Sequence, residues 1–245
     1  MNYEYISADN HMDKLWIPAD LWQERLPKRL RDVGPKVVEA EKGTSWEWEG
    51  KLRGAAADGA DNSKHIERFR SKGVTIEDGA LPPSDPKYLL EHMDLSKIFS
   101  SVVFGDVRKW NIADPELLLE VYRAYNDFCL ELSRASPERI IMLPNVPTAL
   151  PEACPSEIER VAKAGARGFE FCPFDVATPV WDEVWEPTWA AAEECGLVLC
   201  AHIGGSADSA VPGFGRGAHH AFLSTAPLNV ANMCAEMIFS AVFER

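Results

Sequence analysis

The chain has 245 residues, of which 46% are hydrophobic, and its formal net charge at pH 7 is −13. This length allows one sizeable core and suits a single α/β barrel, whereas the acidic balance argues against a nucleic-acid or anionic-membrane surface, because both attract basic patches. The sequence shows no signal-peptide pattern, no apolar run of membrane-spanning length and no CxxC pair among its six cysteines, so we expect a cytoplasmic protein.

An acid and a histidine follow the first predicted strand. Residues Tyr5–Ala8 are apolar and β-leaning and predict a short buried strand, which is followed by Asp9 and His11. Because residues i and i+2 of an extended chain point to the same side, both side chains can approach one point beyond the strand, and together they suit zinc, manganese or iron. The alternative is that Asp9 is a turn acid and that His11 is merely exposed.

A long segment separates this strand from the next one. After a short amphipathic helical segment at 16–31, residues 37–49 predict a β-hairpin with a glycine-containing turn. Residues 51–84 are rich in Gly, Ala, Asp and Pro with little periodicity, and they predict a long surface loop that is either part of a lid or inert. His65 and His92 have no partner at a ligand spacing, so we expect both at the surface.

From residue 85 onward, helices and strands alternate. Helices are expected at 85–95, 114–136, 156–164, 181–195 and 227–243, and strands at 98–104, 139–143, 168–172 and 197–202. Such alternation implies a parallel sheet with right-handed crossovers. A barrel is preferred to a nucleotide-binding domain, because neither a phosphate-binding glycine fingerprint nor a nucleophile elbow follows a strand.

The strand at 197–202 ends in the same way as the first strand. His202 closes an apolar run and precedes Gly204 and Gly205, which allow a backbone to approach a ligand closely. The C-terminal ends of parallel strands lie on one face of a barrel. We therefore expect His202, Asp9 and His11 to converge on one divalent metal ion, with the ring nitrogens of the two histidines about 3–5 Å apart.

Several short motifs occur in a distinctive order. They lie at Ile6–His11, Ala19–Trp22, Tyr125–Phe128, Pro137–Ile140, Leu143–Val146 and Ala201–Gly205. In this order they resemble the amidohydrolase-related family, in the branch that includes aminocarboxymuconate-semialdehyde decarboxylase and the resorcylate-type decarboxylases. The resemblance covers most of the chain outside residues 51–84.

The resemblance implies a (β/α)₈ barrel of the TIM type with one divalent metal ion, which is zinc, manganese or iron. It assigns the metal to Asp9, His11 and His202, and it also predicts ligands on strands six and eight of the family. Five of the eight strands are predicted here, so we expect a single incomplete barrel domain over 1–245, with an insertion at about 12–84 and without the family's C-terminal third.

The implied activity is hydrolysis or non-oxidative decarboxylation of a small carboxylate-bearing or aromatic substrate. Both reactions need a proton donor or acceptor beside the metal. Asp106 and His219 are candidates for this role, although the alternatives are a turn acid and a surface histidine. Arg216 is a candidate clamp for a substrate carboxylate, and Phe174 is a second candidate substrate-binding residue.

Two other functions remain open. One is a catalytically silent barrel fragment, or a subunit that needs a partner to complete the site, and the other is a ligand-binding module without a metal. Five strands leave two open sheet edges, at Tyr5–Ala8 and at 197–202. We expect the chain alone to associate through these edges or to need a partner that supplies strands.

Overall fold

The structure is a computed structural model that describes residues 3–245 except residues 42, 57–65, 106–109, 173–175, 177 and 203–217. The chain forms two compact units. The N-terminal unit consists of residues 1–107 and 112–144, and the C-terminal unit consists of residues 108–111 and 145–245. The prediction of a single domain over 1–245 stays a prediction.

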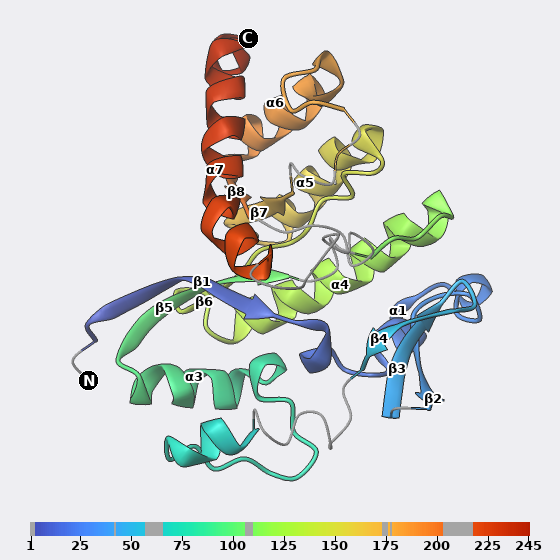
Figure 1. The fold of residues 1–245 in the computed structure, drawn as a ribbon, viewed down its shortest axis with the longest axis vertical. Coiled ribbons are helices and arrows are strands. Elements are labelled where there is room, and N and C mark those ends of the chain that lie inside the picture. The colour runs from blue at the N-terminus through green and yellow to red at the C-terminus, as the bar shows by residue number, and fades with distance from the viewer. Residues whose placement is uncertain are drawn as a thin grey trace. The chain divides into compact units, whose positions relative to one another are not determined.

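A parallel sheet of three strands forms the centre of the N-terminal unit (Figure 1). Its order is β1 (Tyr5–Met12), β5 (Ile98–Gly105) and β6 (Ile140–Met142), and both neighbouring pairs are parallel. The β-branched and aromatic residues of β5 favour a strand, and Val103 and Phe104 are buried in the core. The predicted strands at 98–104 and 139–143 are thus confirmed.

Helix α3 (Pro86–Leu95) leads into β5, and helix α4 (Pro115–Ala135) connects β5 to β6. The start of α4 is fixed by Asp114, whose Oδ1 accepts the backbone N–H of Glu116 at 2.9 Å and that of Leu117 at 3.2 Å. Proline at the first helical position adds to this signal. The helix predicted at 114–136 is thus confirmed. It could be predicted from sequence because its N-cap and its apolar period are both local features.

Close packing at the end of β5 requires a glycine. A Cβ atom on Gly105 would lie 2.5 Å from the Oη atom of Tyr125 on α4. Helix α4 is also fixed to α1 (Leu21–Arg25), because the indole N–H of Trp22 donates to the carbonyl of Val121 at 3.1 Å. The C-terminal end of β5 therefore packs closely against α4.

Strand β1 is longer and more exposed than predicted. It continues to Met12, so Asp9 and His11 lie within the strand rather than beyond it. Tyr5 and Ile6 are 60% and 69% exposed, which corrects the prediction of a buried strand. The physical reason is that, within the described residues, β1 pairs with β5 alone and is an edge strand.

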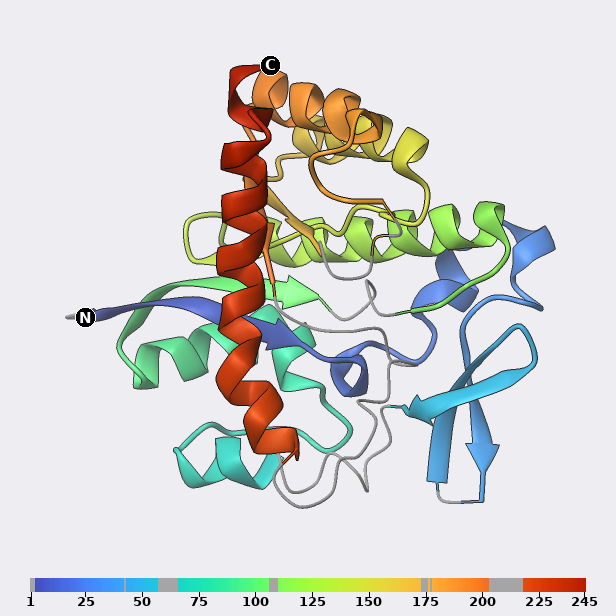
Figure 2. The same ribbon diagram turned by 45° about the horizontal axis from the view of Figure 1, so that its top comes forward.

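The insertion contains a second sheet of three antiparallel strands (Figure 2). The predicted hairpin is confirmed as β2 (Lys36–Ala40) and β3 (Gly43–Trp48), but a third strand, β4 (Lys51–Ala55), occupies part of the predicted loop. The turn between β3 and β4 has positive φ at both Glu49 (51°) and Gly50 (71°), as a two-residue hairpin turn of type I′ requires.

The remainder of the insertion is also more ordered than predicted. Residues 66–71 are helical, although residues 51–84 lack a clear apolar period. The helical segment expected at 16–31 is broken into short pieces, because Pro18 and Pro27 interrupt helical hydrogen bonding. The chain has short 3-10 turns at Lys14–Trp16, Lys28–Leu30, Pro82–Ser84, Pro151–Ala153, Glu183–Trp185 and Val242–Glu244.

The C-terminal unit contains a pair of parallel strands, β7 (Gly168–Phe171) and β8 (Val198–Ala201), as predicted. Helices α5 (Cys154–Lys163) and α6 (Glu186–Cys195) pack against each other and lead into these two strands. Helix α6 ends at Gly196 in the left-handed region, with φ of 65°. The five predicted parallel strands are therefore present, three in one unit and two in the other.

The core of the C-terminal unit is aromatic. The ring of Phe171 lies 5.2 Å from the ring of Trp185 and 5.0 Å from the ring of Trp189. Helix α7 (Ala218–Phe239) contributes Met233 and Met237 to this core. Because large aromatic side chains bury much apolar area, this cluster is a main source of stability in the unit.

Helix α7 differs from the helix predicted at 227–243. It begins at Ala218, and Pro227 lies inside it. Cys234 and Ile238 on this helix are both exposed, and the exposed fraction of Ile238 is 60%. Among the described residues, no helix combines the length and the apolar character needed to cross a membrane.

Candidate metal and substrate site

Asp9 and His11 lie side by side on β1. The Nε2 atom of His11 is 3.0 Å from Oδ1 of Asp9, as the two-residue period of a strand predicts. The side chain of His11 is 37% exposed and that of Asp9 is 70% exposed. An ion can therefore reach both groups without displacing packed core residues.

A second carboxylate acts on the same imidazole. The Oδ1 atom of Asp13 lies 3.8 Å from Nδ1 of His11. The carboxylates of Asp13 and Asp9 raise the pKa of His11 above its usual value, against the opposing effect of partial burial. The imidazole thus lies in a negative local potential, which favours a cation at this position, whether a proton or a metal ion.

Neighbouring hydrogen bonds fix the orientation of this part of β1. The side-chain amide of Asn10 donates to the hydroxyl of Ser101 at 3.0 Å, on the neighbouring strand β5. The Oδ1 atom of Asn10 accepts the backbone N–H of His11 at 2.9 Å. These bonds hold the Asp9 and His11 side chains on the opposite side of the strand from Asn10.

His202 follows directly after β8 in the C-terminal unit and is half-buried. Its side chain, like those of Asp9 and His11, offers one ligand atom of a type that binds divalent metals. Two residues before it, Cys200 pairs in register with Glu170 of β7. The convergence of His202 with Asp9 and His11 stays a prediction.

Sequence reasoning missed a buried carboxyl group in the C-terminal unit. Glu170 is 1% exposed, and its Oε2 atom accepts a hydrogen bond of 3.0 Å from the amide of Asn145, which is fully buried. Burial, together with the charge of Glu170, raises the pKa of Cys200. A glutamate between two phenylalanines in an apolar strand is the signal that could have found this group.

A pocket of about 320 Å³ lies next to His11 in the N-terminal unit. We call it the His11 pocket, and its lining residues are Asn10, His11, Asp13, Trp16, Arg68, Phe69, Lys72, Pro83 and His92. Several of them belong to the predicted surface loop. His92 corrects our expectation of a surface residue, because it is half-buried, its ring centroid lies 5.0 Å from that of Phe69, and its Nε2 atom lies 3.4 Å from Nζ of Lys72.

Several predicted site residues lie outside what the structure describes. Asp106, Phe174, Arg216 and His65 are not among the described residues. The backbone of His219 belongs to the first turn of α7, but its side chain is outside the described part. The roles expected for these residues stay predictions.

Comparison with known proteins assigns the chain to a protein family. A family model for amidohydrolases matches residues 98–235, which is more than half of the chain. No curated protein sequence matches the chain significantly.

Solved structures of similar fold include an amidohydrolase from Mycobacterium avium subsp. paratuberculosis K-10, with a TM-score of 0.69 and 20% identity over 100% of this chain and 70% of that chain. A 5-carboxyvanillate decarboxylase from Sphingomonas paucimobilis has a TM-score of 0.54 and 22% identity over 64% of this chain and 47% of that chain.

A third structure of similar fold is a 5-carboxyvanillate decarboxylase variant from Novosphingobium aromaticivorans DSM 12444, which was solved with bound manganese and 3-methoxy-4-hydroxy-5-nitrobenzoic acid. Its TM-score is 0.54, and the identity is 16% over 85% of this chain and 53% of that chain. The chain thus spans about half the length of these two decarboxylases. At these identities the likeness shows the fold, which is that of an α/β barrel with a few of its parallel strands present.

Proposed function

The chain belongs to the amidohydrolase family, and from this premise we propose that it is a divalent-metal-dependent hydrolase or carboxy-lyase acting on a small carboxylate-bearing or aromatic substrate. The observation that carries the proposal is the pair of Asp9 and His11, whose side chains lie 3.0 Å apart on an accessible part of β1. Manganese bound in the Novosphingobium decarboxylase of similar fold supports a metal-dependent reaction.

The residues present fit a divalent metal ion. Carboxylate oxygen and imidazole nitrogen are suitable donors for zinc, manganese and iron, and the negative surroundings of His11 favour a cation. We infer that Asp9, His11 and His202 would hold one such ion. When bound, the ion supplies either a hydroxide at neutral pH or a charge that holds substrate oxygens while CO₂ leaves.

The remaining tasks fall to other residues of the chain. A proton must be delivered or removed beside the metal, and substrate must be oriented. We propose Asp106 and His219 for the proton and Arg216 and Phe174 for contact with substrate. Hydrolysis and decarboxylation share this division of tasks, so both belong to the proposal.

Metal binding tests the proposal directly. The purified protein should hold about one manganese, zinc or iron ion per chain by elemental analysis, and Asp9→Ala or His11→Ala should weaken metal binding by roughly tenfold or more. Asp32→Asn, which changes an exposed acid, is the matched control. Activity should then be assayed with and without metal on hydroxybenzoates for CO₂ release and on simple amides for hydrolysis.

The alternative is a silent fragment, or a subunit that needs a partner chain. A protein that stays free of metal when manganese, zinc or iron is supplied, and that gives the same result for the wild type and for His11→Ala, would favour this alternative.

A further inference from the structure

We propose that helix α7 carries an interface at which two copies of this chain dimerise, with the outer faces of the two helices packed antiparallel. The interface is formed by four residues, which we call the α7 stripe: Leu228, Ala231, Ala235 and Ile238. The inference goes beyond the proposed function, because it depends neither on the metal ligands nor on the substrate. It also differs from the pairing of open strand edges, because two helices meet.

The α7 stripe lies on the side of the helix that faces away from the core. Its members follow one another at spacings of three, four and three residues, which places them on one face of a helix. Met233 and Met237 come from the other face and are buried in the core of the C-terminal unit. Leu228 is 65% exposed and Ile238 is 60% exposed, and Ala231 between them is exposed as well. The stripe is thus open to a partner.

The outer face of α7 lacks the charges that an exposed helix normally carries. Glu236 is the only Asp, Glu, Lys or Arg residue in the sequence of Ala218–Phe239. Exposed helices usually place charged residues on the side away from the core, whereas a helix that is apolar all round is normally covered. Phe239 and Phe243, which are 89% and 73% exposed, extend the apolar surface beyond the stripe. This composition favours contact with another apolar surface.

The order of large and small residues makes the α7 stripe complementary to a second copy of itself. In an antiparallel pair centred on Met233, Leu228 meets the partner's Ile238, and Ala231 meets the partner's Ala235. Two-fold symmetry supplies the reverse contacts. Large side chains thus meet at both ends of the stripe, and the alanines at its centre allow the two helices to approach closely. Antiparallel packing also brings opposite ends of the helix dipoles together.

The carboxylate of Glu236 is compatible with this arrangement. It accepts a hydrogen bond of 2.8 Å from the side-chain amide of Asn232, one turn earlier on the helix. In the antiparallel register Glu236 lies level with the partner's Val230, so the Glu236 carboxylates of the two copies are about 9 Å apart along the helix axis, at about 1.5 Å per residue. These two like charges therefore do not face each other across the interface.

The size of the outer face predicts how strongly the two copies associate. A helix of 22 residues is about 33 Å long and about 10 Å wide, so pairing covers roughly 300 Å² on each copy. Stable interfaces of standard size cover about 800 Å² on each partner. We therefore expect a reversible dimer that dissociates on dilution rather than a permanent one.

Sedimentation velocity over a range of protein concentrations tests the inference. The wild type should change from monomer to dimer as its concentration rises. Leu228→Glu and Ile238→Glu should each weaken dimerisation by about tenfold or more, because a carboxylate would have to be desolvated in the interface. Leu95→Glu, at a leucine of α3 that is 52% exposed, is the matched control and should leave dimerisation unchanged. A thermal melt of each variant shows whether it is folded.

Opposite charges at the two ends of the stripe test the antiparallel register. The double variant Leu228→Lys/Ile238→Glu places a lysine opposite a glutamate at both end contacts, so it should dimerise more tightly than Leu228→Glu/Ile238→Glu. In a parallel pair each position would meet its own copy, and both double variants would be repelled. Equal dimerisation of the two double variants would therefore overturn the antiparallel register. A wild type that stays monomeric at every concentration, or self-association that persists unchanged in both single glutamate variants, would overturn the inference as a whole.

Discussion

The side-chain amide of Asn145 donates a hydrogen bond of 3.0 Å to the carboxyl group of Glu170, and both residues are almost completely buried. Asn145 also forms a parallel backbone bridge with Glu170, so backbone and side chains connect the same two positions. A buried carboxyl group is costly unless it is hydrogen-bonded. This pair is therefore part of what holds β7 in place.

Removal of the donor should destabilise the C-terminal unit. Asn145→Ala leaves a buried acceptor of Glu170 without this hydrogen bond, and we expect a loss of about 1–3 kcal/mol in the free energy of unfolding. Urea denaturation followed by tryptophan fluorescence measures it. Asn232→Ala, which removes an amide bonded to Glu236 at an exposed position, is the matched control and should be close to neutral. Equal stability of the two variants would contradict the structural role of Asn145.

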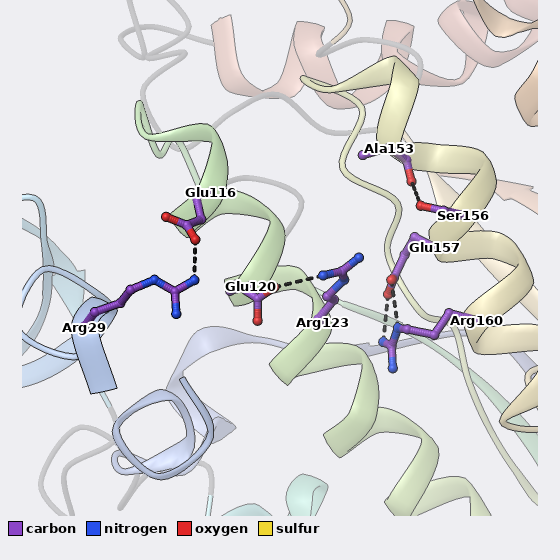
Figure 3. Close-up of polar contacts among 8 residues, drawn as sticks. All are labelled: Arg29, Glu116, Glu120, Arg123, Ala153, Ser156, Glu157 and Arg160. Carbon is purple, nitrogen blue, oxygen red and sulfur yellow. Dashed lines mark hydrogen bonds and ion pairs between the residues drawn. The ribbon is translucent and has the colours of Figure 1, made fainter. Parts of the chain in front are cut away.

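The second prediction concerns a buried acid on α5 (Figure 3). Glu157 is fully buried, and Arg160 binds its two carboxylate oxygens through Nε and Nη2, each at 2.8 Å. Arg160→Met removes two charge-assisted hydrogen bonds from a buried carboxylate, so we expect a loss of about 1.5–3 kcal/mol in unfolding free energy. Arg29→Met, at the exposed pair with Glu116 shown in the same figure, should have no measurable effect. A larger loss of unfolding free energy in Arg29→Met than in Arg160→Met would contradict this prediction.

The third prediction is a pH dependence of stability that arises from His92. Burial and the charge of Lys72 lower its pKa in the folded state, whereas the unfolded chain takes up a proton near pH 6.5. The contribution of neutral His92 to the free energy of unfolding is therefore fully present above pH 6.5. It is lost as pH falls below that value, because the unfolded state then binds more protons than the folded state. The other charged or titratable groups of the same pocket are Arg68, Asp13 and His11.

Urea midpoints at pH 7.5 and 5.5 measure this effect. The wild type should lose stability between the two values, and His92→Gln should lose less. NMR titration of the His92 ring gives an independent check, since its midpoint should lie below 6.5. An equal acid sensitivity of the wild type and of His92→Gln would show that other groups cause the loss.

Local signals account for the parts of the fold that could be predicted from sequence. The N-cap at Asp114 and the apolar period after it predict α4 without knowledge of its neighbours. The spacing of Asp9 and His11 predicts their adjacency, because the period of a strand is a property of the backbone. Both features depend only on residues close together in the chain.

The features of the fold and of the candidate site that sequence reasoning missed depend on contacts between distant residues. The His11 pocket brings Arg68 and Lys72 together with His92 and Trp16, and no short-range pattern contains that information. The apolar character of Ile6 alone predicts a buried strand, whereas its exposure agrees with the open sheet edge that a count of five strands leaves at Tyr5–Ala8. The convergence of His202 with Asp9 and His11 is likewise a tertiary relationship, and it stays a prediction.

Open sheet edges lead to the last prediction, which concerns self-association. Within the described residues, β1 pairs only with β5 and β8 only with β7, so one side of each strand has no strand neighbour. Ile6 on β1 is 69% exposed and Val198 on β8 is 62% exposed. Exposed apolar edge strands are templates for pairing with another chain, so we propose that the protein associates through these edges.

Light scattering coupled to size-exclusion chromatography measures the association. The wild type should elute above the 27.2 kDa of a single chain. Ile6→Lys and Val198→Lys should shift it toward the monomer, because an edge lysine opposes strand pairing and its charge would have to be desolvated in the interface. Val33→Lys, at a 46% exposed apolar position outside the described strands, is the matched control and should leave the association unchanged. A monodisperse monomer with a sharp melting transition in the wild type would contradict association through the edges, because a stable monomer requires both edges to be protected within one chain.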